Sequence, residues 1–157
     1  MKELWYTREA ACFEEALPIG NGNLGAMVYG GVKREKVSLN EDTLWSGFPG
    51  AKGPLGTHEG VAEGEQLLRA GNVKQAEKVV WEKCFSEWSA AYQPAGTLWI
   101  SFPDAGEAED YRRSLDLEHA AAHTAYRSGG FTFRREAFVS FPDKVIALRF
   151  TTDGPQA

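Results

Sequence analysis

Two neighbouring carboxylates and an indole ring lie in a short polar segment, residues 40–47, with the sequence NEDTLWSG. Glu41 and Asp42 are of the residue types that act as general acids and bases in catalysis. Because successive side chains of an extended chain point to opposite faces, these carboxylates cannot easily approach one substrate from both sides. Asn and Asp side chains also bond to nearby backbone groups and hold turns. We therefore expect Asn40 and Asp42, helped by Thr43, to stabilise a turn.

A second segment, residues 20–25 (GNGNLG), has the glycine spacing GxGxxG of dinucleotide-binding loops. Such a loop must follow a buried strand and open a helix, whose N-terminus holds the pyrophosphate. Pro18 makes the preceding residues a poor central strand, and Met27, Val28 and Tyr29 continue into a strand and a turn. The context therefore argues against nicotinamide binding, and we expect no cofactor.

The histidines and cysteines are candidate metal ligands. His119 and His123 are four residues apart and would share one face of a helix, but the aromatic pattern that follows favours a strand, and no third ligand is visible. Cys12 and Cys84 are far apart and lack the paired spacing of a zinc site. We expect surface histidines, no metal, and two reduced thiols that are buried or half-buried; a disulfide would require an exported protein.

Length and charge exclude several classes of partner. The chain has 157 residues, enough for one domain with its own core. With 17 Lys and Arg against 22 Asp and Glu, it has no positive surplus to neutralise phosphates, so we expect no nucleic-acid partner. No stretch approaches the ~20 apolar residues of a membrane span, and the N-terminus lacks the apolar core of a signal peptide. The sequence predicts a cytoplasmic protein without a membrane partner, unless a leader has been removed.

The elements that must position these residues begin with a hairpin. Residues 24–29 and 35–39 have strand character and are separated by Gly30 and Gly31, with slack at residues 32–34. Residues 40–53 have turn chemistry and no periodicity, so we expect a loop there.

A helical hairpin is predicted for residues 59–85. Gly71 ends the first helix, and Asn72 is placed to cap the second. Spacings of three and four in the second helix predict an inward stripe, made of Val73, Ala76, Val80 and Cys84.

From residue 94 onward the apolar period becomes two, which is typical of strands. We expect four to five antiparallel strands in a meander that forms part of a sandwich. The residues expected to share its inner face are Leu98, Ile100, Phe102, Leu115, Leu117, Ala120, Ala122, Thr124, Tyr126, Ile146, Leu148 and Phe150. The predicted fold is mainly β, an antiparallel β-sandwich with an inserted helical hairpin.

Several ordered motifs resemble the N-terminal region of glycoside hydrolase family 95, the α-L-fucosidase and α-L-galactosidase group. They are residues 16–47, YQPAGTL at 92–98, YRRSLDL at 111–117, and FTFRREAF with the following Pro142, Val145 and Phe150. The resemblance implies that the chain is the front part of a longer supersandwich domain, followed in the full-length protein by a helical (α/α)6 barrel. That barrel would be its partner and would hold the Glu acid and Asp base of an inverting hydrolase. We therefore expect no catalytic residue in this chain, although the full-length, bacterial-type enzyme would be a hydrolase acting on terminal α-linked fucose or L-galactose.

The same resemblance offers a second interpretation of residues 40–47. The loop could lie over the mouth of the barrel, with Asn40, Glu41, Asp42, Thr43 and Trp45 as candidates for the substrate rim, where an oligosaccharide would enter. Two other functions stay open. One is a non-catalytic carbohydrate-binding sandwich using Trp45, Trp88 or Trp99 as platforms; the other is a structural or oligomerising module. A fragment with unpaired strand edges is also expected to self-associate.

Overall fold

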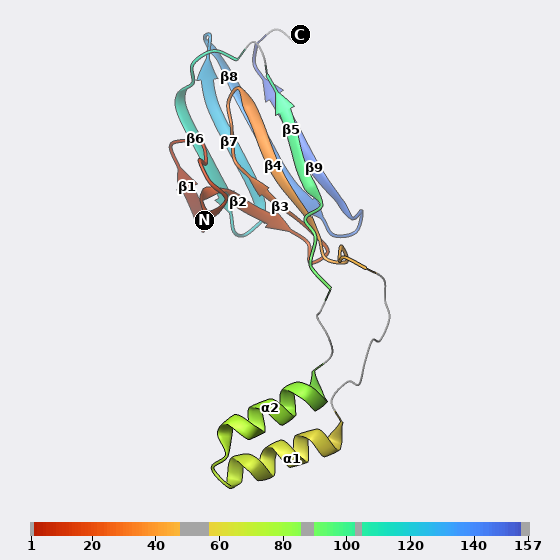
Figure 1. The fold of residues 1–157 in the computed structure, drawn as a ribbon. Coiled ribbons are helices and arrows are strands. Elements are labelled where there is room, and N and C mark those ends of the chain that lie inside the picture. Colours follow the sequence, from red (N-terminus) through yellow and green to blue (C-terminus); the bar gives the residue numbers. More distant parts are fainter. Residues whose placement is uncertain (1, 48–56, 86–89, 103–104, 155–157) are drawn as a thin grey trace. The chain divides into compact units, whose positions relative to one another are not determined.

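The computed structural model describes residues 2–47, 57–85, 90–102 and 105–154 (Figure 1). The chain divides into two compact units, one comprising Met1–Leu44 with Pro94–Ala157 and the other Trp45–Gln93. The first unit holds all nine strands of the described residues, and the second holds a pair of helices. The predicted boundary between β structure and an inserted helical hairpin is confirmed.

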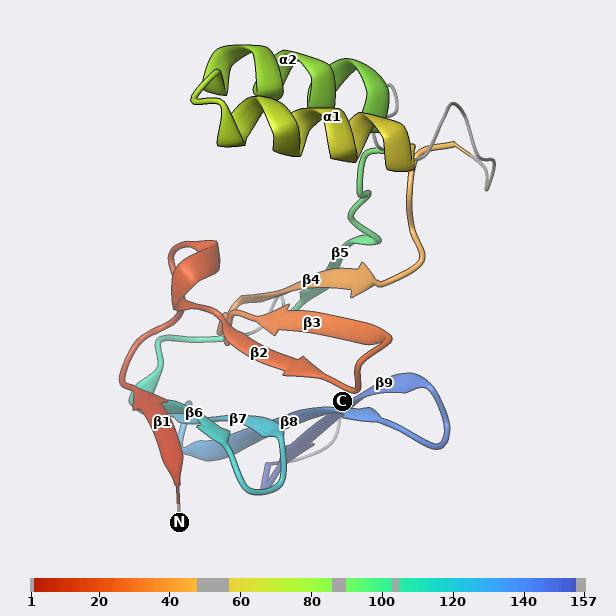
Figure 2. The same cartoon turned by 90° about the horizontal axis from the view of Figure 1, so that it is seen from below.

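The first unit is a sandwich of two antiparallel sheets, which Figure 2 shows as two facing layers. The larger sheet has the strand order β1-β6-β7-β8-β9 and the smaller one β2-β3-β4-β5. The bounds of the strands are β1 Glu3–Tyr6, β2 Leu17–Gly20, β3 Leu24–Val28, β4 Arg34–Glu41, β5 Gly96–Ser101, β6 Glu109–Asp116, β7 Ala121–Ser128, β8 Phe131–Ser140 and β9 Val145–Thr152. A single 3-10 turn, η1 (Phe13–Glu15), precedes β2.

The core lies between the two layers and follows the two-residue alternation of the strands. Its buried apolar cluster comprises Leu17, Ile19, Ala26, Val28, Val37, Leu115, Ala122 and Ala137. Val37, at the centre of β4, is fully buried. Burying one such aliphatic side chain contributes about 1.5–3 kcal/mol, so the alternation itself is a main source of the sandwich's stability.

Several strand assignments differ from the sequence prediction. The meander comprises β6 to β9, whereas β5 pairs with β4 in the smaller sheet. Ala120 lies in the turn before β7, with a φ of 53°, and does not continue the inner face. Strand β4 runs to Glu41, so Asn40 and Glu41 end a strand and do not begin the loop; residues 48–53 of that predicted loop lie outside the described residues.

The positions of β2 and β3 account for Pro18 and for the glycine motif. Pro18 is exposed in β2, which is an edge strand, so its missing N–H takes no bond from the sheet. The hairpin of β2 and β3 also confirms that the glycine motif between them turns from strand to strand and opens no helix. Strand β1 was not predicted; it pairs with β6 from Glu3↔Asp116 to Tyr6↔Arg113.

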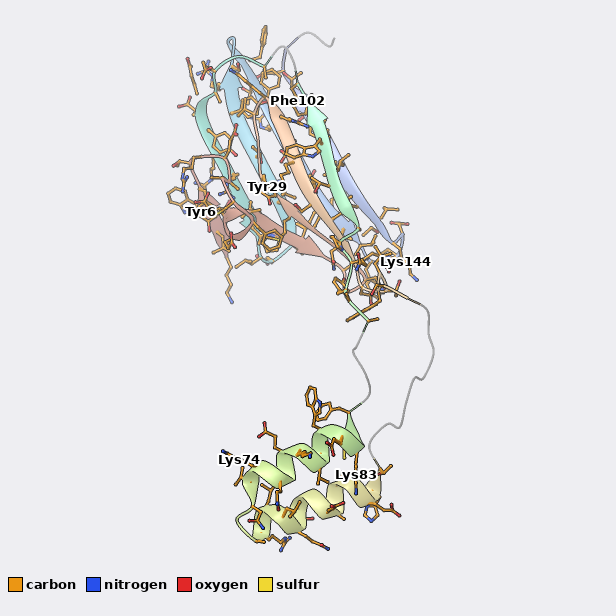
Figure 3. The ribbon with its side chains drawn as sticks, in the orientation of Figure 1. Tyr6, Tyr29, Lys74, Lys83, Phe102 and Lys144 are labelled. Atoms are coloured by element: carbon orange, nitrogen blue, oxygen red, sulfur yellow. The ribbon has the colours of Figure 1, made fainter. Side chains whose placement is uncertain are left out.

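The second unit is a pair of antiparallel helices, α1 (His58–Arg69) and α2 (Val73–Cys84). Their contact is made where α1 has glycine. A Cβ on Gly60 would lie 2.9 Å from Cys84 Sγ, and a Cβ on Gly64 would lie 2.7 Å from Val80 Cγ2. The helices therefore approach more closely than larger residues would allow. The Lys83 ammonium on α2, labelled in Figure 3, pairs with the Glu63 carboxylate on α1.

Details of the hairpin correct the predicted inward stripe. Ala76 is buried and Val80 and Cys84 are half-buried, as expected, but Val73 is 61% exposed because it begins the helix. Asn72 occupies the cap position of α2 without a side-chain capping bond, whereas Thr57 Oγ1 caps α1 by accepting from Gly60 N. Cys12, in the first unit, is exposed and not buried or half-buried. Among the described residues, no helix has the length and apolar character needed to cross a membrane.

Candidate functional site

The turn between β2 and β3 is organised by Asn21. Its Oδ1 accepts from the backbone N–H groups of Asn23 and Leu24, at 3.0 and 2.8 Å. Its Nδ2 donates to the backbone oxygen of Ser140, at the end of β8, at 2.9 Å. One amide side chain thus shapes a turn of the smaller sheet and joins it to the larger sheet.

Asn23 joins the same turn to the end of β4. Its Nδ2 lies 3.1 and 3.3 Å from the two carboxylate oxygens of Asp42, and its backbone oxygen accepts from Asp42 N at 3.0 Å. The Asp42 carboxylate is therefore held by an amide across the sheet end.

Glu41 closes the turn that follows β4. Its Oε2 accepts from the backbone N–H of Thr43 at 3.0 Å and from the Thr43 hydroxyl at 2.7 Å. Its backbone oxygen accepts from Leu44 N at 3.3 Å. A carboxylate bonded in this way shapes the turn, so Glu41 takes part in the turn-holding role that the sequence suggested for its neighbours. We call the group Asn21, Asn23, Glu41, Asp42 and Thr43 the exposed polar end.

Trp45, the fifth rim candidate, belongs to the helical unit. It forms an isolated antiparallel bridge with Tyr92, and their rings pack edge to face with centroids 4.9 Å apart. Beside them, Ser46 N donates to Ala91 O at 2.7 Å and Ala91 N donates to Ser46 Oγ at 2.8 Å. The Trp45–Tyr92 pair thus fastens the two chain segments at the base of the helical insertion, while Trp45 stays 52% exposed.

The other candidates for sugar stacking and for metal binding have less support. Trp99 on β5 is 47% exposed, but the Arg34 guanidinium lies 4.0 Å from its ring centroid, so one face of the indole is already in contact with a cation. Trp88 lies outside the described residues. His119 is in a turn, bonded to Asp116 at 2.8 Å, whereas His123 is in β7, so the two do not share a helical face. Within the described residues, no cluster of three potential metal ligands occurs.

At the opposite end of the smaller sheet, an ion pair is buried between the layers. Arg135 Nη1 on β8 lies 3.0 Å from Glu35 Oε2 on β4, and their side chains are 8% and 3% exposed. Arg135 also donates to the backbone oxygens of Gly31 and Val32 and to the Tyr126 hydroxyl. The guanidinium packs 4.1 Å from the centre of the Phe102 ring, whose position beside β5 Figure 3 shows. This arrangement satisfies a buried charge on several sides.

The surroundings of Glu35 and Tyr111 show the effect of this burial. Burial raises the pKa of the Glu35 carboxyl above its usual range, against the opposing effects of the Gly30 N–H and Arg135. Burial likewise raises the pKa of the Tyr111 hydroxyl, which donates to Gly30 O at 2.6 Å. Gly30 has a φ of 75°, a conformation that favours glycine. We call the group Gly30, Glu35, Tyr111, Tyr126 and Arg135 the buried polar end.

Arg113 on β6 makes a further tie within the sandwich. It is 1% exposed, and its Nε and Nη1 each donate at 2.7 Å, to the backbone oxygens of Arg8 and Glu15. Its Nη2 is the buried side-chain atom for which the described residues supply no hydrogen-bond partner, but the guanidinium lies 4.2 Å from the centre of the Tyr6 ring. Arg113 thus fixes the segment between β1 and β2 against the larger sheet.

Comparison with known proteins assigns this architecture to a family. Residues 4–157 match the family described as the N-terminal domain of glycosyl hydrolase family 65. The chain belongs to this family. In this glycoside hydrolase domain Arg113 and Arg135, which belong to two of the motifs that gave the resemblance, are buried and hydrogen-bonded to backbone oxygens, so these two motif residues are structural.

The relatives of the glycoside hydrolase domain are named as fucosidases, in agreement with the resemblance to family 95. A protein from Arabidopsis thaliana named alpha-L-fucosidase 2 is 38% identical over 90% of this chain and 17% of its own length. Proteins named probable alpha-fucosidase A are 31% identical in Aspergillus niger, over 88% of this chain and 18% of the relative, and 28% identical in Aspergillus oryzae, over 95% and 21%. The chain spans about a fifth of the length of these relatives.

Proposed function

We propose that the full-length protein is an α-L-fucosidase-like hydrolase that releases terminal α-linked L-fucose, or the related L-galactose, with inversion. The observation that carries this proposal is the 38% identity to alpha-L-fucosidase 2 over 90% of the chain. In the full-length protein, we expect this domain to support a downstream (α/α)6 barrel, which would supply the catalytic groups and bind the oligosaccharide.

We place the acid and the base outside this chain. Inversion uses two carboxyl groups about 6.5–9.5 Å apart with a water between them. The carboxylates of the rim candidates, Glu41 and Asp42, are bonded to Thr43 and Asn23, and Glu35 is bonded to a buried arginine. Each of these acids has a partner that suits a structural role.

The experiment measures sugar release by the full-length protein from aryl α-L-fucosides and α-L-galactosides. We expect fucose release with the β-anomer formed first, observed by NMR, and no turnover by the chain of residues 1–157 alone. Failure of the full-length protein to cleave either sugar would refute the proposed activity. Turnover by the isolated chain, free of contaminating enzymes, would refute the placement of the catalytic groups.

We further propose that Asn40, Glu41, Asp42, Thr43 and Trp45 lie at the substrate rim of the full-length protein. Trp45→Ala and Glu41→Gln, made in that protein, should raise KM more than they lower kcat, because rim contacts add binding without acting on the reacting bond. Unchanged kinetics with unchanged stability would remove these residues from the substrate site.

Self-association of this chain also remains a prediction. The edge strands β5 and β9 present backbone N–H and C=O groups that lack a strand on one side within the described sheets. Apolar side chains beside these edges are partly exposed, among them Leu98 at 38%, Val145 at 49% and Phe150 at 40%. We expect dimers in sedimentation at ~100 μM, and a clean monomer would contradict this. The bacterial source and cytoplasmic location suggested by the sequence are likewise predictions.

A further inference from the structure

The outer face of the larger sheet contains a shallow depression of about 150 Å³. The strand register places the outward-facing residues of its lining in two adjacent rows, and the inward-facing Arg135 contributes to its floor. His123, Glu136 and Arg149 stand side by side on β7, β8 and β9, and Arg134 stands opposite Thr151 in the next row. Ala125 is the neighbour of Arg134 on β7, so a small side chain borders the long arginine there.

The charges in this depression do not balance. Arg149 Nη1 approaches Glu136 Oε2 at 3.8 Å, which is a loose, exposed pair. Arg134 is paired in the sheet with Ala125 and Thr151. The Thr132 N–H and, to a smaller extent, the charge of Arg134 lower the pKa of the Asp153 carboxyl, which does not line the depression. Two arginines therefore face one carboxylate, on a chain whose net charge is −5. Cross-strand charge pairing explains Glu136 and Arg149, whereas Arg134 has no charged residue opposite it on either neighbouring strand.

The donors and acceptors in the depression restrict the chemistry of a ligand. Arginine presents a planar fork of N–H donors that matches a carboxylate or another oxyanion. Glu136 accepts hydrogen bonds, and the Thr151 hydroxyl, which donates to the Arg134 backbone oxygen at 3.4 Å, can also accept. A ligand that carries both an oxyanion and neighbouring hydroxyls would satisfy both sets, whereas a bare inorganic oxyanion would meet repulsion from Glu136.

We propose that this depression binds the carboxylate of an acidic sugar, such as a uronic acid unit of an oligosaccharide. Arg134 and Arg149 hold the carboxylate, and Glu136 and Thr151 bond to sugar hydroxyls. The inference rests on the proposed function in that it takes the full-length protein to act on carbohydrates. It adds a carbohydrate-binding site, separate from the proposed substrate rim, on a face of the domain that holds none of the rim candidates.

Calorimetric titration of the chain of residues 1–157 with a galacturonic acid trisaccharide tests this site, with the neutral galactose trisaccharide and inorganic phosphate as separate arms. We expect saturable binding of the acidic trisaccharide, weaker by about tenfold in Arg134→Gln and in Arg149→Gln, the effect of losing one charge-assisted bond. Raising the salt concentration should weaken it, because the site is exposed.

Two further variants separate a specific site from general charge. Arg69→Gln, on α1, makes the same charge change at an exposed arginine paired with Glu65, and should leave binding unchanged. Glu136→Gln should weaken the acidic trisaccharide less than either arginine variant does and should strengthen phosphate binding, because it removes the repelling charge but keeps a polar group. Circular dichroism verifies that each variant is folded.

The site is refuted if the neutral trisaccharide or phosphate binds as well as the acidic one, if nothing binds, or if Arg69→Gln weakens binding as much as Arg134→Gln. Sugar release by the full-length protein is a separate measurement. If the full-length protein releases fucose but the chain binds no uronate, only this inference is overturned. If the chain binds uronate but the full-length protein releases no fucose, only the proposed activity is overturned.

Discussion

The two ends of the smaller sheet are both polar, but they are built in different ways. At the buried polar end, the charged pair Arg135 and Glu35 is enclosed between the layers and bonded to backbone groups of the turn after β3. At the exposed polar end, amide and carboxylate side chains tie three strand ends together in contact with solvent. A buried charge is expensive to leave unpaired, whereas an exposed one can turn to water. The buried end should therefore determine whether the sandwich folds, and the exposed end can change with little loss.

The largest expected effect is at the buried end. Arg135→Met removes the guanidinium and leaves Glu35 buried without its partner, which should lower the free energy of unfolding by about 3–5 kcal/mol. Urea denaturation measures this change. The double variant Arg135→Met with Glu35→Gln should recover part of the loss, because no charge is then left behind. A loss below about 1 kcal/mol in the single variant would remove the distinction between the two ends.

The same substitution, glycine to alanine, can be made at both ends and its effect on stability compared. Gly30 and Gly22 both have positive φ, 75° and 97°. A Cβ on Gly30 would collide with the Tyr111 hydroxyl and lie 3.0 Å from Arg113 Cδ, whereas a Cβ on Gly22 would meet nothing within 4 Å. We expect Gly30→Ala to lower the unfolding free energy by about 2–4 kcal/mol and Gly22→Ala by about 1 kcal/mol, from backbone strain alone. Equal losses in thermal or urea unfolding would show that crowding at the buried end is relieved by movement of Tyr111.

A smaller effect is expected from the amide that ties the exposed end. Asn23→Ala removes the bond to Asp42 and should lower stability by about 1 kcal/mol, the usual net contribution of an exposed or partly exposed hydrogen bond. Asn21→Ala, which removes three bonds including the one to Ser140, serves as the comparison and should have a larger effect. Losses of the size seen for Arg135→Met would contradict the view that this end tolerates change.

The smallest effect concerns pH. His119, with the backbone N–H of Glu118, lowers the pKa of the Asp116 carboxyl, so the stability from this group is present above the ordinary Asp pKa and is lost as pH falls through the lowered one. The pKa of Glu35 is raised, so Glu35 ionises first in the unfolded chain, and its contribution declines as pH rises through that interval. The measurement is the difference in thermal stability between the original protein and each variant, followed from pH 3 to pH 6. This difference should rise with pH for Asp116→Asn and fall with pH for Glu35→Gln. Slopes of the same sign would contradict the assignment of burial as the cause at Glu35.

The sequence predicted the parts of the fold that follow from local periodicity. The alternation from residue 94 onward identified the strands of the meander, and the stripe around Ala76 identified α2. Periodicity could not assign β5 to the smaller sheet, because strand partners are chosen by tertiary packing. It also misplaced Val73, whose position at the first turn exposes it despite the correct spacing. Strand β1 escaped notice because it is only four residues long and largely exposed.

The polar ends were harder to predict than the strands. Asn40, Asp42 and Thr43 were expected to hold a turn, but Asn40 lies in β4 and the turn bonds of Glu41 were not expected. The partner Asn23 was also missed, since it comes from a turn distant in the sequence. The buried pair did have a signal in the sequence. Glu35 and Arg135 are two residues from Val37 and Ala137, so each shares the inward face of its strand with an apolar residue. A charge at an inward position predicts a buried partner, but the sequence alone does not say which one.

The Trp45–Tyr92 pair has a consequence for the entropy of the chain. By holding residues 45 and 92 together, it closes the helical insertion into a loop whose ends are already neighbours, just beyond the β4–β5 ladder. The closure entropy of such a loop grows only with the logarithm of its length, by about 0.6 kcal/mol for each doubling. We therefore expect the pairing of the strands on either side to depend only weakly on how many residues lie between those two aromatic side chains.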